Sequence, residues 1–552
     1  MNSRDLMADP VTWAIARAGI TGITTKQLTT VTNLPPPHVA ARLERLSADT
    51  TITRHGRGLW VLSRFTVLEP DAASFRGPGS YAGAFEREFS LRMGREERDI
   101  RFNPNERRPV HRWWPYVQGF SADFVEATCQ KFGIARGAVV LDPFCGSGTV
   151  LTAARSRGAM GIGIDLMPIA TFVSSAKSEW TTDPEALREA ARGALQDRTA
   201  PTIPPPFLRE TRRQFSPPVL RSLLRLKQNV RAAPEGASRT LLTLALASIL
   251  IDSSNLKRSP CLGYTRKPGL TAETPLVLFR AAVERMCEDL LRLQHDASSW
   301  GPPPDVYLGN AGSIGLTPES IDLAVTSPPY VNGMDYVMNY KIDLAWLDFV
   351  SSYQELARLR SSMVACDNIP RRTTTDYQPS REVLSERWVA QAARGISRNI
   401  SAKGVYRRDD MGVIVTKYFD DLVPVIRNVY RGLRPGGRFV VVNGDSLIAG
   451  TYVPGDLIFA RMAAREGFEI ESLDFARHRR SGQRRGFLLR ETVTTLRKPR
   501  VSRTRSSPDR VNRVPVPFPA SGAPSPKGSF GGSRDAPRRI PRTPSAKGSP
   551  PW

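Results

Sequence analysis

Short apolar runs and amphipathic segments alternate along most of the chain. Residues 139–141 and 161–164 are apolar runs, and residues 149–157 between them have helical periodicity and stop at Gly158. Residues 305–310, 321–325, 439–442, 468–475 and 488–496 are further strand-like runs, and 418–433 is helical. Strands that alternate with helices in this way predict an α/β fold, with a seven-stranded, doubly wound, Rossmann-like sheet.

The first sixty residues have a different pattern. Residues 11–19, 25–33 and 35–49 read as three helices, with Thr24 as the N-cap of the second, and 51–62 reads as a hairpin that turns at 55–58. Three helices and a hairpin predict a winged-helix-like domain at 1–63. Its basic residues suit DNA contact, although packing on the rest of the chain or dimerisation is the alternative. These residues are Arg42, Arg45, Arg54, His55 and Arg57.

The remaining segments divide by composition. Residues 64–108 are predicted to be a linker with one helix near 84–92, and 109–498 to be the main domain. Within it we expect a helical insert at about 184–304 and a second, basic and poorly periodic insert at about 352–410. Residues 499–552 are rich in Pro, Ser, Gly and Arg, which makes a packed core implausible, so we expect a disordered basic tail.

Charge and cysteine content narrow the class of protein. The formal net charge is +25, and thirteen Lys or Arg face only two acids from residue 497 onwards, which points to a nucleic-acid partner. The five cysteines show no paired spacing, so we expect a reducing compartment and no structural metal. The chain shows no 18-residue apolar run and no signal pattern, which predicts a cytoplasmic protein without a membrane span.

The glycine-rich stretch 139–165 has the features of a ligand site. Gly146 and Gly148 lie in the turn between the strand and the helix, where backbone can approach a ligand at a helix N-terminus. Asp165 follows 17 residues after Gly148, at the end of the second strand, where ribose hydroxyls are usually bound. The stretch therefore predicts a nucleotide-like ligand.

A second stretch, Thr-Ser-Pro-Pro-Tyr at 326–330, follows directly on the apolar run 321–325. The prolines fix the backbone and remove donors, so that carbonyl oxygens can face a pocket. A strand-end Ser327, the carbonyl groups beside Pro328 and Pro329, and the ring of Tyr330 suit an exocyclic amino group on a stacked base. A stiff loop with a buried tyrosine is the alternative interpretation.

Together the sequences DPFCGSGT (142–149) and TSPPY (326–330) resemble the S-adenosyl-L-methionine-dependent amino methyltransferases of DNA, which modify cytosine N4 or adenine N6. The resemblance extends loosely over 109–498 and includes the block 111–120. It implies that the cofactor is bound by Asp142, Phe144, Gly146, Gly148 and Thr149, with Asp165 on the ribose. It further implies that Ser327, Pro328, Pro329 and Tyr330 bind the target base.

The chain departs from the family at one position. Relatives usually carry an acid after the third strand, where it meets the adenine of the cofactor, whereas this chain has Asn310. An amide oxygen can still accept from that amino group, with weaker binding as the expected cost. The block order resembles members whose target-recognition region lies between the two blocks, and a Ser before Pro-Pro-Tyr is more often found with cytosine N4.

These features predict a site-specific methyltransferase of double-stranded DNA, directed at cytosine N4, with restriction or defence proteins as candidate partners. Adenine N6, the guanine amino group of transfer RNA, and a DNA-binding regulator with an inactive methyltransferase fold remain alternatives. Two segments are candidates for target recognition: the basic, aromatic loop 255–267, for which a solvated loop is the alternative, and the second insert. Trp113 and Trp114 are expected either in the core or against the cofactor, with at least one in the core.

Overall fold

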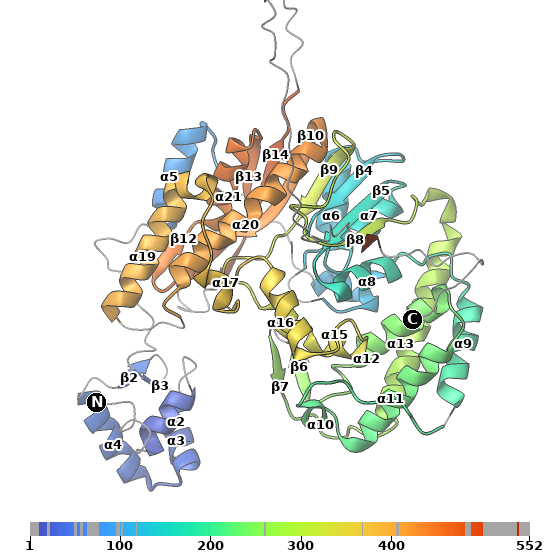
Figure 1. The fold of residues 1–552 in the computed structure, drawn as a ribbon, viewed down its shortest axis with the longest axis horizontal. Coiled ribbons are helices and arrows are strands. Elements are labelled where there is room, and N and C mark those ends of the chain that lie inside the picture. Colours follow the sequence, from blue (N-terminus) through green and yellow to red (C-terminus); the bar gives the residue numbers. More distant parts are fainter. Residues whose placement is uncertain are drawn as a thin grey trace, which may run out of the picture.

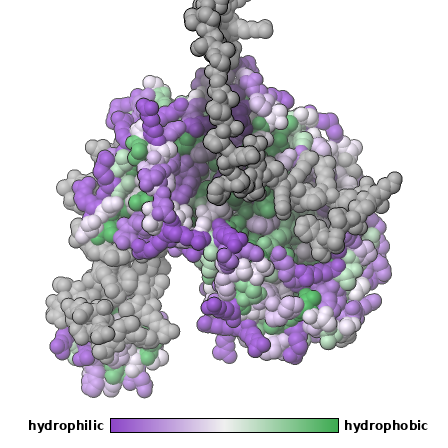
Figure 2. All heavy atoms as spheres, viewed as in Figure 1, coloured by the Kyte–Doolittle hydropathy of each residue, from purple (hydrophilic) through white to green (hydrophobic). Residues whose placement is uncertain are grey.

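The computed structural model describes residues 10–18, 23–48, 52–55, 59–62, 77–94, 100, 103–116, 119–197, 199–258, 261–366, 368–403, 408–480, 487–500 and 538–539. Figure 1 shows three parts: a small N-terminal unit, a sheet with flanking helices, and a helical lobe beside it. Among the residues coloured in Figure 2, hydrophilic ones predominate on the face shown, with smaller hydrophobic patches between them.

The N-terminal unit contains the predicted helices and hairpin. Gln27 N donates to Thr24 Oγ1 (3.2 Å) and Thr24 N donates to Gln27 Oε1 (2.9 Å), a capping box that confirms the predicted N-cap. A short additional strand completes an antiparallel sheet in the order β1-β3-β2. The elements are α2 (Pro10–Ala18), β1 (Ile23–Thr24), α3 (Thr25–Thr32), α4 (Pro36–Ala48), β2 (Ile52–His55) and β3 (Leu59–Leu62).

All seven strands predicted for the main sheet are present. They stand in the order β13-β14-β10-β9-β4-β5-β8, and the five strands from β10 to β8 are parallel. β14 is antiparallel to both of its neighbours. The strands are β4 (Val139–Asp142), β5 (Met160–Asp165), β8 (Asp305–Leu308), β9 (Ile321–Thr326), β10 (Leu433–Gly444), β13 (Glu469–Arg480) and β14 (Leu488–Arg497).

The sheet is buried on both faces, which explains why its strands read as continuous apolar runs. In β10, Phe439 and Val441 pack into one hydrophobic cluster, whereas Val440 and Val442 pack into another on the opposite face. Helices α6 (Ala122–Lys131) and α7 (Thr149–Ser156) belong to the second cluster, and α20 (Met411–Gly432) and α21 (Gly455–Arg465) to the first. The doubly wound α/β architecture is therefore confirmed.

The direction of winding reverses between β4 and β9. The chain goes outward from β4 to β5 and β8, returns to place β9 on the other side of β4, and continues outward to β10. Ligands of open parallel sheets bind in the crevice at the carboxyl ends of the strands at such a reversal point. The turn after β4 and the Ser-Pro-Pro-Tyr loop after β9 both begin there.

The turn predicted between α20 and the following strand lies inside the strand. β10 begins at Leu433, pairs there with Ile321, and pairs again from Arg438 onwards after a register shift. Gly436 has a φ of +85°, which favours glycine. The Arg-Pro-Gly-Gly-Arg sequence therefore forms a bulge in β10.

Part of the predicted linker belongs to the core, and its helix lies earlier than expected. Helix α5 (Pro78–Phe89) buries Tyr81 and Phe85, and the ring of Tyr81 packs edge-on against Trp388 at 5.1 Å. Glycine and proline residues in and around this helix interrupt the helical spacing of its apolar residues. For this reason the composition suggested a linker.

The first insert is helical, as predicted, and forms the lobe seen in Figure 1. Its helices are α9 (Pro184–Gln196), α10 (Thr211–Gln214), α11 (Pro217–Ala232), α12 (Ala237–Ile249) and α13 (Thr274–His295). The loop expected at 255–267 is instead a hairpin of β6 (Leu256–Arg258) and β7 (Leu262–Tyr264).

The second insert is more ordered than its composition indicated. It contains α16 (Tyr353–Ser362), α17 (Arg372–Thr375), α18 (Arg381–Ser385) and α19 (Arg387–Lys403). Trp388, Val389, Ala392 and Ile396 of α19 are buried in the cluster that also contains α20. The expectation of a poorly periodic segment was therefore wrong, because the many arginines of α19 hid its apolar stripe.

Of the predicted disordered tail the structure describes little. Arg538 and Arg539 form a two-residue strand, β15, antiparallel to β8 at the edge of the sheet. At these two residues the prediction of disorder is wrong. Almost all other residues of the predicted tail lie outside the described part of the chain.

Candidate active site

Hydrogen bonds join the two predicted blocks at the point where the sheet reverses. Thr326 Oγ1, at the end of β9, donates to Asp142 Oδ1, at the end of β4, over 2.7 Å. The same oxygen accepts from Phe144 N at 3.0 Å. Burial raises the pKa of Asp142 to about 7, while these two donors act in the opposite direction. Asp142 therefore fixes the position of one loop relative to the other.

The glycine turn is shaped by close contacts. Gly146 has a φ of +51°, and a Cβ atom there would lie 3.0 Å from the ring of Tyr116. Gly148 has a φ of +79° and caps α7, but a Cβ atom there would meet Ser174 at 3.0 Å. Gly146 thus faces the cavity described next, whereas Gly148 packs on α8 (Pro168–Ala176) and shapes the turn from behind.

Asp165 lies at the end of β5, as predicted, and holds the same turn. Its Oδ2 accepts from Gly146 N at 2.9 Å and its Oδ1 accepts from Met167 N at 2.8 Å. Burial raises the pKa of the carboxyl group to about 6, and the backbone donors oppose that rise. Each oxygen keeps capacity for a further hydrogen bond, since a carboxylate oxygen accepts more than one.

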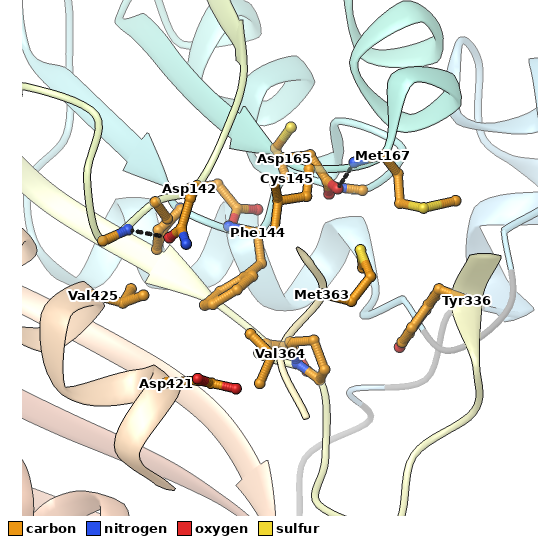
Figure 3. A pocket seen from close by; sticks show the side chains of 18 of the residues that line it. Asp142, Phe144, Cys145, Asp165, Met167, Tyr336, Met363, Val364, Asp421 and Val425 are labelled. Carbon is orange, nitrogen blue, oxygen red and sulfur yellow. Dashed lines mark hydrogen bonds between the residues drawn. The ribbon is translucent and has the colours of Figure 1, made fainter. Parts of the chain in front are cut away.

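A cavity of about 550 Å³ opens in front of this turn. Its walls come from the turn after β4, the ends of β5 and β8, helix α20, and residues 361–364 at the C-terminal end of α16. Figure 3 shows Asp142, Phe144, Cys145, Asp165 and Met167 on one side, with Met363, Val364 and Tyr336 opposite them. Six of the predicted cofactor residues line it: Asp142, Phe144, Gly146, Thr149, Asp165 and Asn310.

Asn310 follows β8, as the family pattern requires, but its amide oxygen is already engaged. Asn310 Oδ1 accepts from Gly312 N at 2.8 Å, so the oxygen caps its own loop. The amide oxygen of Asn310, the predicted acceptor for the adenine amino group of the cofactor, therefore already accepts one hydrogen bond from the backbone.

Helix α20 contributes charged residues to the cavity that the sequence did not reveal. Asp421 accepts from Lys417 Nζ at 2.7 Å and from Ala365 N at 3.0 Å, and burial raises its pKa. Asp420 accepts from Tyr377 Oη at 2.7 Å. In the sequence these acids look like the polar face of an amphipathic helix, and only the packing of the second insert places them at a site.

The aromatic block at 111–120 confirms the expectation that at least one tryptophan lies in the core, and it contributes a tyrosine to the cavity. Trp113 and Trp114 are both buried in the core, and Trp113 Nε1 donates to Asp289 Oδ2 at 2.9 Å. Tyr116 lines the cavity instead, with its ring stacked on Tyr340 at 5.6 Å.

A second cavity, of about 180 Å³, lies next to the first and shares Gly119, Phe120, Ser327 and Tyr336 with it. Pro328 and Tyr330 line this second cavity, whereas Pro329 lines the first. The four predicted reaction residues thus surround the junction. Other lining residues of the second cavity are Ile100, Val442, Arg477, Arg479 and Glu491.

Tyr330 is held within this second cavity. Its side chain is hydrogen-bonded to that of Ser327, and burial raises its pKa well above the usual range. The guanidinium carbon of Arg479 lies 5.3 Å from the centre of the phenol ring.

The basic loop proposed for target recognition divides into two groups. Arg258 is buried, forms an ion pair with the buried Asp343, and lies 4.4 Å from the ring centre of Tyr340. Its role is therefore structural, contrary to expectation. Lys257 and Arg266 are exposed and remain candidates for contact with phosphates.

Within the described part of the chain, no group of three or more His, Cys, Asp or Glu residues is arranged to hold a metal ion. No helix among the described residues has the length and apolar character needed to cross a membrane.

Comparison with known proteins places the chain beside methyltransferases. It is 25% identical to type II methyltransferase M.BsoBI of Geobacillus stearothermophilus over 72% of this chain and 88% of the relative. It is 23% identical to type II methyltransferase M.AvaI of Nostoc sp. over 74% of this chain and 90% of the relative. No family model matches the chain.

Among solved structures, a SAM-dependent methyltransferase from Methanosarcina mazei is 12% identical over 67% of this chain and 97% of its own, with a TM-score of 0.23. A TM-score this low does not establish a shared fold. The similarity to the two type II enzymes extends over about three quarters of the chain and supports a methyltransferase.

Proposed function

We propose that the protein is a site-specific DNA methyltransferase that transfers a methyl group from S-adenosyl-L-methionine to N4 of a flipped cytosine. The observation that carries this proposal is the junction of the two cavities at Ser327 and Tyr336. The larger cavity contains the glycine turn and the smaller contains Tyr330, so cofactor and base would meet at the end of β9. Transfer requires this proximity.

The larger cavity fits the cofactor in three respects. Gly146 leaves space beside Tyr116 that a side chain would fill, and the N-terminus of α7 lies behind the turn. The half-buried carboxylate of Asp165 faces the same space and suits ribose hydroxyls. When bound, S-adenosyl-L-methionine supplies an electrophilic methyl group, and Phe144 and Asn310 complete the walls around it.

The smaller cavity would hold the base. Tyr330 provides a ring for stacking, worth about 1–3 kcal/mol, which offsets much of the cost of extruding a nucleotide. Ser327 and the carbonyl of Pro328 accept from the amino group and align its nitrogen with the larger cavity. Because the amino nitrogen is itself the nucleophile, no covalent bond between protein and base is required.

Double-stranded DNA is the proposed substrate. The chain carries a net charge of +25, and Arg42 and Arg45 are exposed on α4 of the winged-helix-like unit. The side chains of Arg54, His55 and Arg57 lie outside the described residues. The relatives' names, type II methyltransferases, support a restriction-modification setting. A partner restriction or defence protein and a place in the cytoplasm are part of the proposal.

The adenine-N6 and transfer-RNA alternatives share the chemistry of the site and differ in substrate. The N-terminal unit favours DNA over RNA, and Ser327 at the head of the loop favours cytosine by its resemblance to the family. The intact glycine turn, Asp165 and the Ser-Pro-Pro-Tyr loop favour an active enzyme over an inactive regulator.

Transfer of tritium from methyl-labelled S-adenosyl-L-methionine tests the proposal. Purified protein is incubated with plasmid DNA or with transfer RNA, and labelled nucleic acid is counted. We expect label in the DNA with the wild type and with the control Tyr353→Ala, whose ring is 39% exposed and outside both cavities. Tyr330→Ala should transfer almost none. Label in transfer RNA alone would refute the substrate.

A further inference from the structure

The far wall of the smaller cavity is charged. Arg477 and Arg479 come from β13, and Glu491 comes from the neighbouring strand β14. Glu491 is buried and accepts from Arg477 Nε. These residues lie on the opposite side of the reversal point from the glycine turn, in strands that neither predicted block includes.

Arg479 has an unused donor at this wall. One of its terminal nitrogens, Nη2, donates to the backbone oxygen of Asp445. Its Nε is ion-paired with Glu491 Oε1 at 3.9 Å, beyond hydrogen-bond distance, and this buried nitrogen makes no hydrogen bond among the described residues. The side chain of Arg479 also lines the smaller cavity, so a ligand there that carries acceptor atoms can use the donors of the guanidinium group that these contacts leave available.

The loop after β9 and this wall complement each other chemically. Ser327 and the Pro328 carbonyl offer acceptors to an amino group, but a buried base also carries ring acceptors that must be satisfied. On cytosine, N3 and O2 are adjacent acceptors on the same edge as the amino group. On adenine that edge has only N1 and then a C–H. An arginine fork donates two parallel bonds to adjacent acceptors.

We propose that Arg479 is the specificity-determining residue for the target base, and that it donates to N3 and O2 of the flipped cytosine. The inference rests on the proposed function and deepens it. Glu491 and the Asp445 carbonyl position the guanidinium group, and Tyr330, 5.3 Å away, holds the ring of the base beside it. Arg477 is already paired with Glu491 and has the positioning role.

The test compares wild type with two substitutions of Arg479 and one control substitution on two substrates, after the methylated site has been mapped by sequencing plasmid DNA treated with wild type. A duplex that contains this site is made with cytosine or with 3-deazacytosine, in which a C–H replaces N3. Single-turnover methylation is measured with wild type, Arg479→Gln and Arg479→Lys. Arg438→Gln is the control, because Arg438 lies in the same sheet, pairs with Glu471, and lines neither cavity.

We expect Arg479→Gln to lower kcat/KM on the cytosine duplex by about 10- to 150-fold, the loss for a charge-assisted hydrogen bond. Lysine should restore little, because an ammonium group cannot form the fork. Wild type should be less active on the 3-deazacytosine duplex than on the cytosine duplex. Arg479→Gln should be equally active on the two duplexes, because it has already lost the bond to N3. Affinity for S-adenosyl-L-methionine, measured by calorimetry, and the melting temperature should match wild type.

Equal 3-deazacytosine penalties in wild type and Arg479→Gln would overturn the inference, as would a wild type that tolerates the analogue. The latter result needs no variant and therefore holds even if Arg479→Gln fails to fold. If wild type methylates no DNA, or methylates adenine, the proposed function fails first. If wild type methylates cytosine but the loss of activity on 3-deazacytosine is the same with and without Arg479, only the role of Arg479 is refuted and the proposed function stands.

Discussion

Replacement of Asp165 by Asn separates cofactor binding from the rest of the site. The carboxylate accepts from Gly146 N and Met167 N, one on each oxygen, and in our account it also accepts from the ribose. In Asn an amide NH₂ group replaces one carboxylate oxygen. This group cannot accept, so it meets the N–H of Gly146 or of Met167 without forming a hydrogen bond. Loss of one charge-assisted bond, about 1.5–3 kcal/mol, should weaken cofactor binding by about 10- to 150-fold at pH 8.

The pH dependence of binding gives a second signature. Burial raises the pKa of Asp165 to about 6, so the ionised acceptor is present above that pH and is lost as the pH falls through it. At pH 5 the wild-type affinity for S-adenosyl-L-methionine should be about tenfold below its plateau, whereas Asp165→Asn should show no step there. Burial, with a smaller contribution from the charge of Asp165, raises the pKa of Asp142 to about 7; because the step near pH 6 belongs to Asp165, Asp142→Asn should retain it.

Isothermal titration calorimetry between pH 5 and pH 8 measures both effects. Asp322→Asn is the matched control, because Asp322 also accepts from a backbone N–H, that of Val139 at 2.8 Å, but lies at the start of β9, at the opposite end of the strand from the cavity. It should bind the cofactor as wild type does. An Asp165→Asn protein with wild-type affinity and a wild-type pH profile would remove Asp165 from the ribose site.

Three further predictions concern the base, the core and the tail. Tyr330→Ala should bind the cofactor normally in calorimetry but lose turnover in a single-turnover assay, with a smaller loss for Ser327→Ala; wild-type turnover in Tyr330→Ala would contradict the stacking role. Arg258→Ala leaves the buried Asp343 unpaired and should lower the free energy of unfolding, measured in urea, by about 3–5 kcal/mol. Lys257→Ala should leave that free energy unchanged and weaken DNA binding. Equal free energies of unfolding in the two variants would refute the distinction between Arg258 and Lys257. Deletion of residues 501–552 should reduce non-specific DNA affinity and its salt dependence in a filter-binding titration without changing the methylated sequence, and a changed site would show that the tail reads bases.

The sequence predicts the strands and the ligand-binding turn well because both depend on local pattern. Val440 and Val442 read as buried, and the φ values of Gly146 and Gly148 match the turn that their spacing suggested. The sequence does not show which strands become neighbours. The order of the sheet therefore rested on the resemblance to a family, and the structure supplies it independently.

Residues that reach the site through long-range packing were not predictable in this way. Tyr116 lies two residues beyond a pair of tryptophans that attracted attention by composition, and Asp421 looks like part of a solvated helix face. Arg479 and Glu491 lie on adjacent strands whose pairing is set by tertiary structure. Each has an ordinary local context, and only the three-dimensional arrangement places it at a cavity.

The identity of the modified nucleoside tests the central claim most directly. Plasmid DNA from a host without its own methyltransferases is treated with the protein and S-adenosyl-L-methionine, digested to nucleosides, and analysed by mass spectrometry against authentic standards. The account predicts N4-methyldeoxycytidine with the wild type and none with Tyr330→Ala. N6-methyldeoxyadenosine alone would contradict the base assignment and the role of Arg479, and DNA without any new methylated nucleoside would contradict the proposed activity itself.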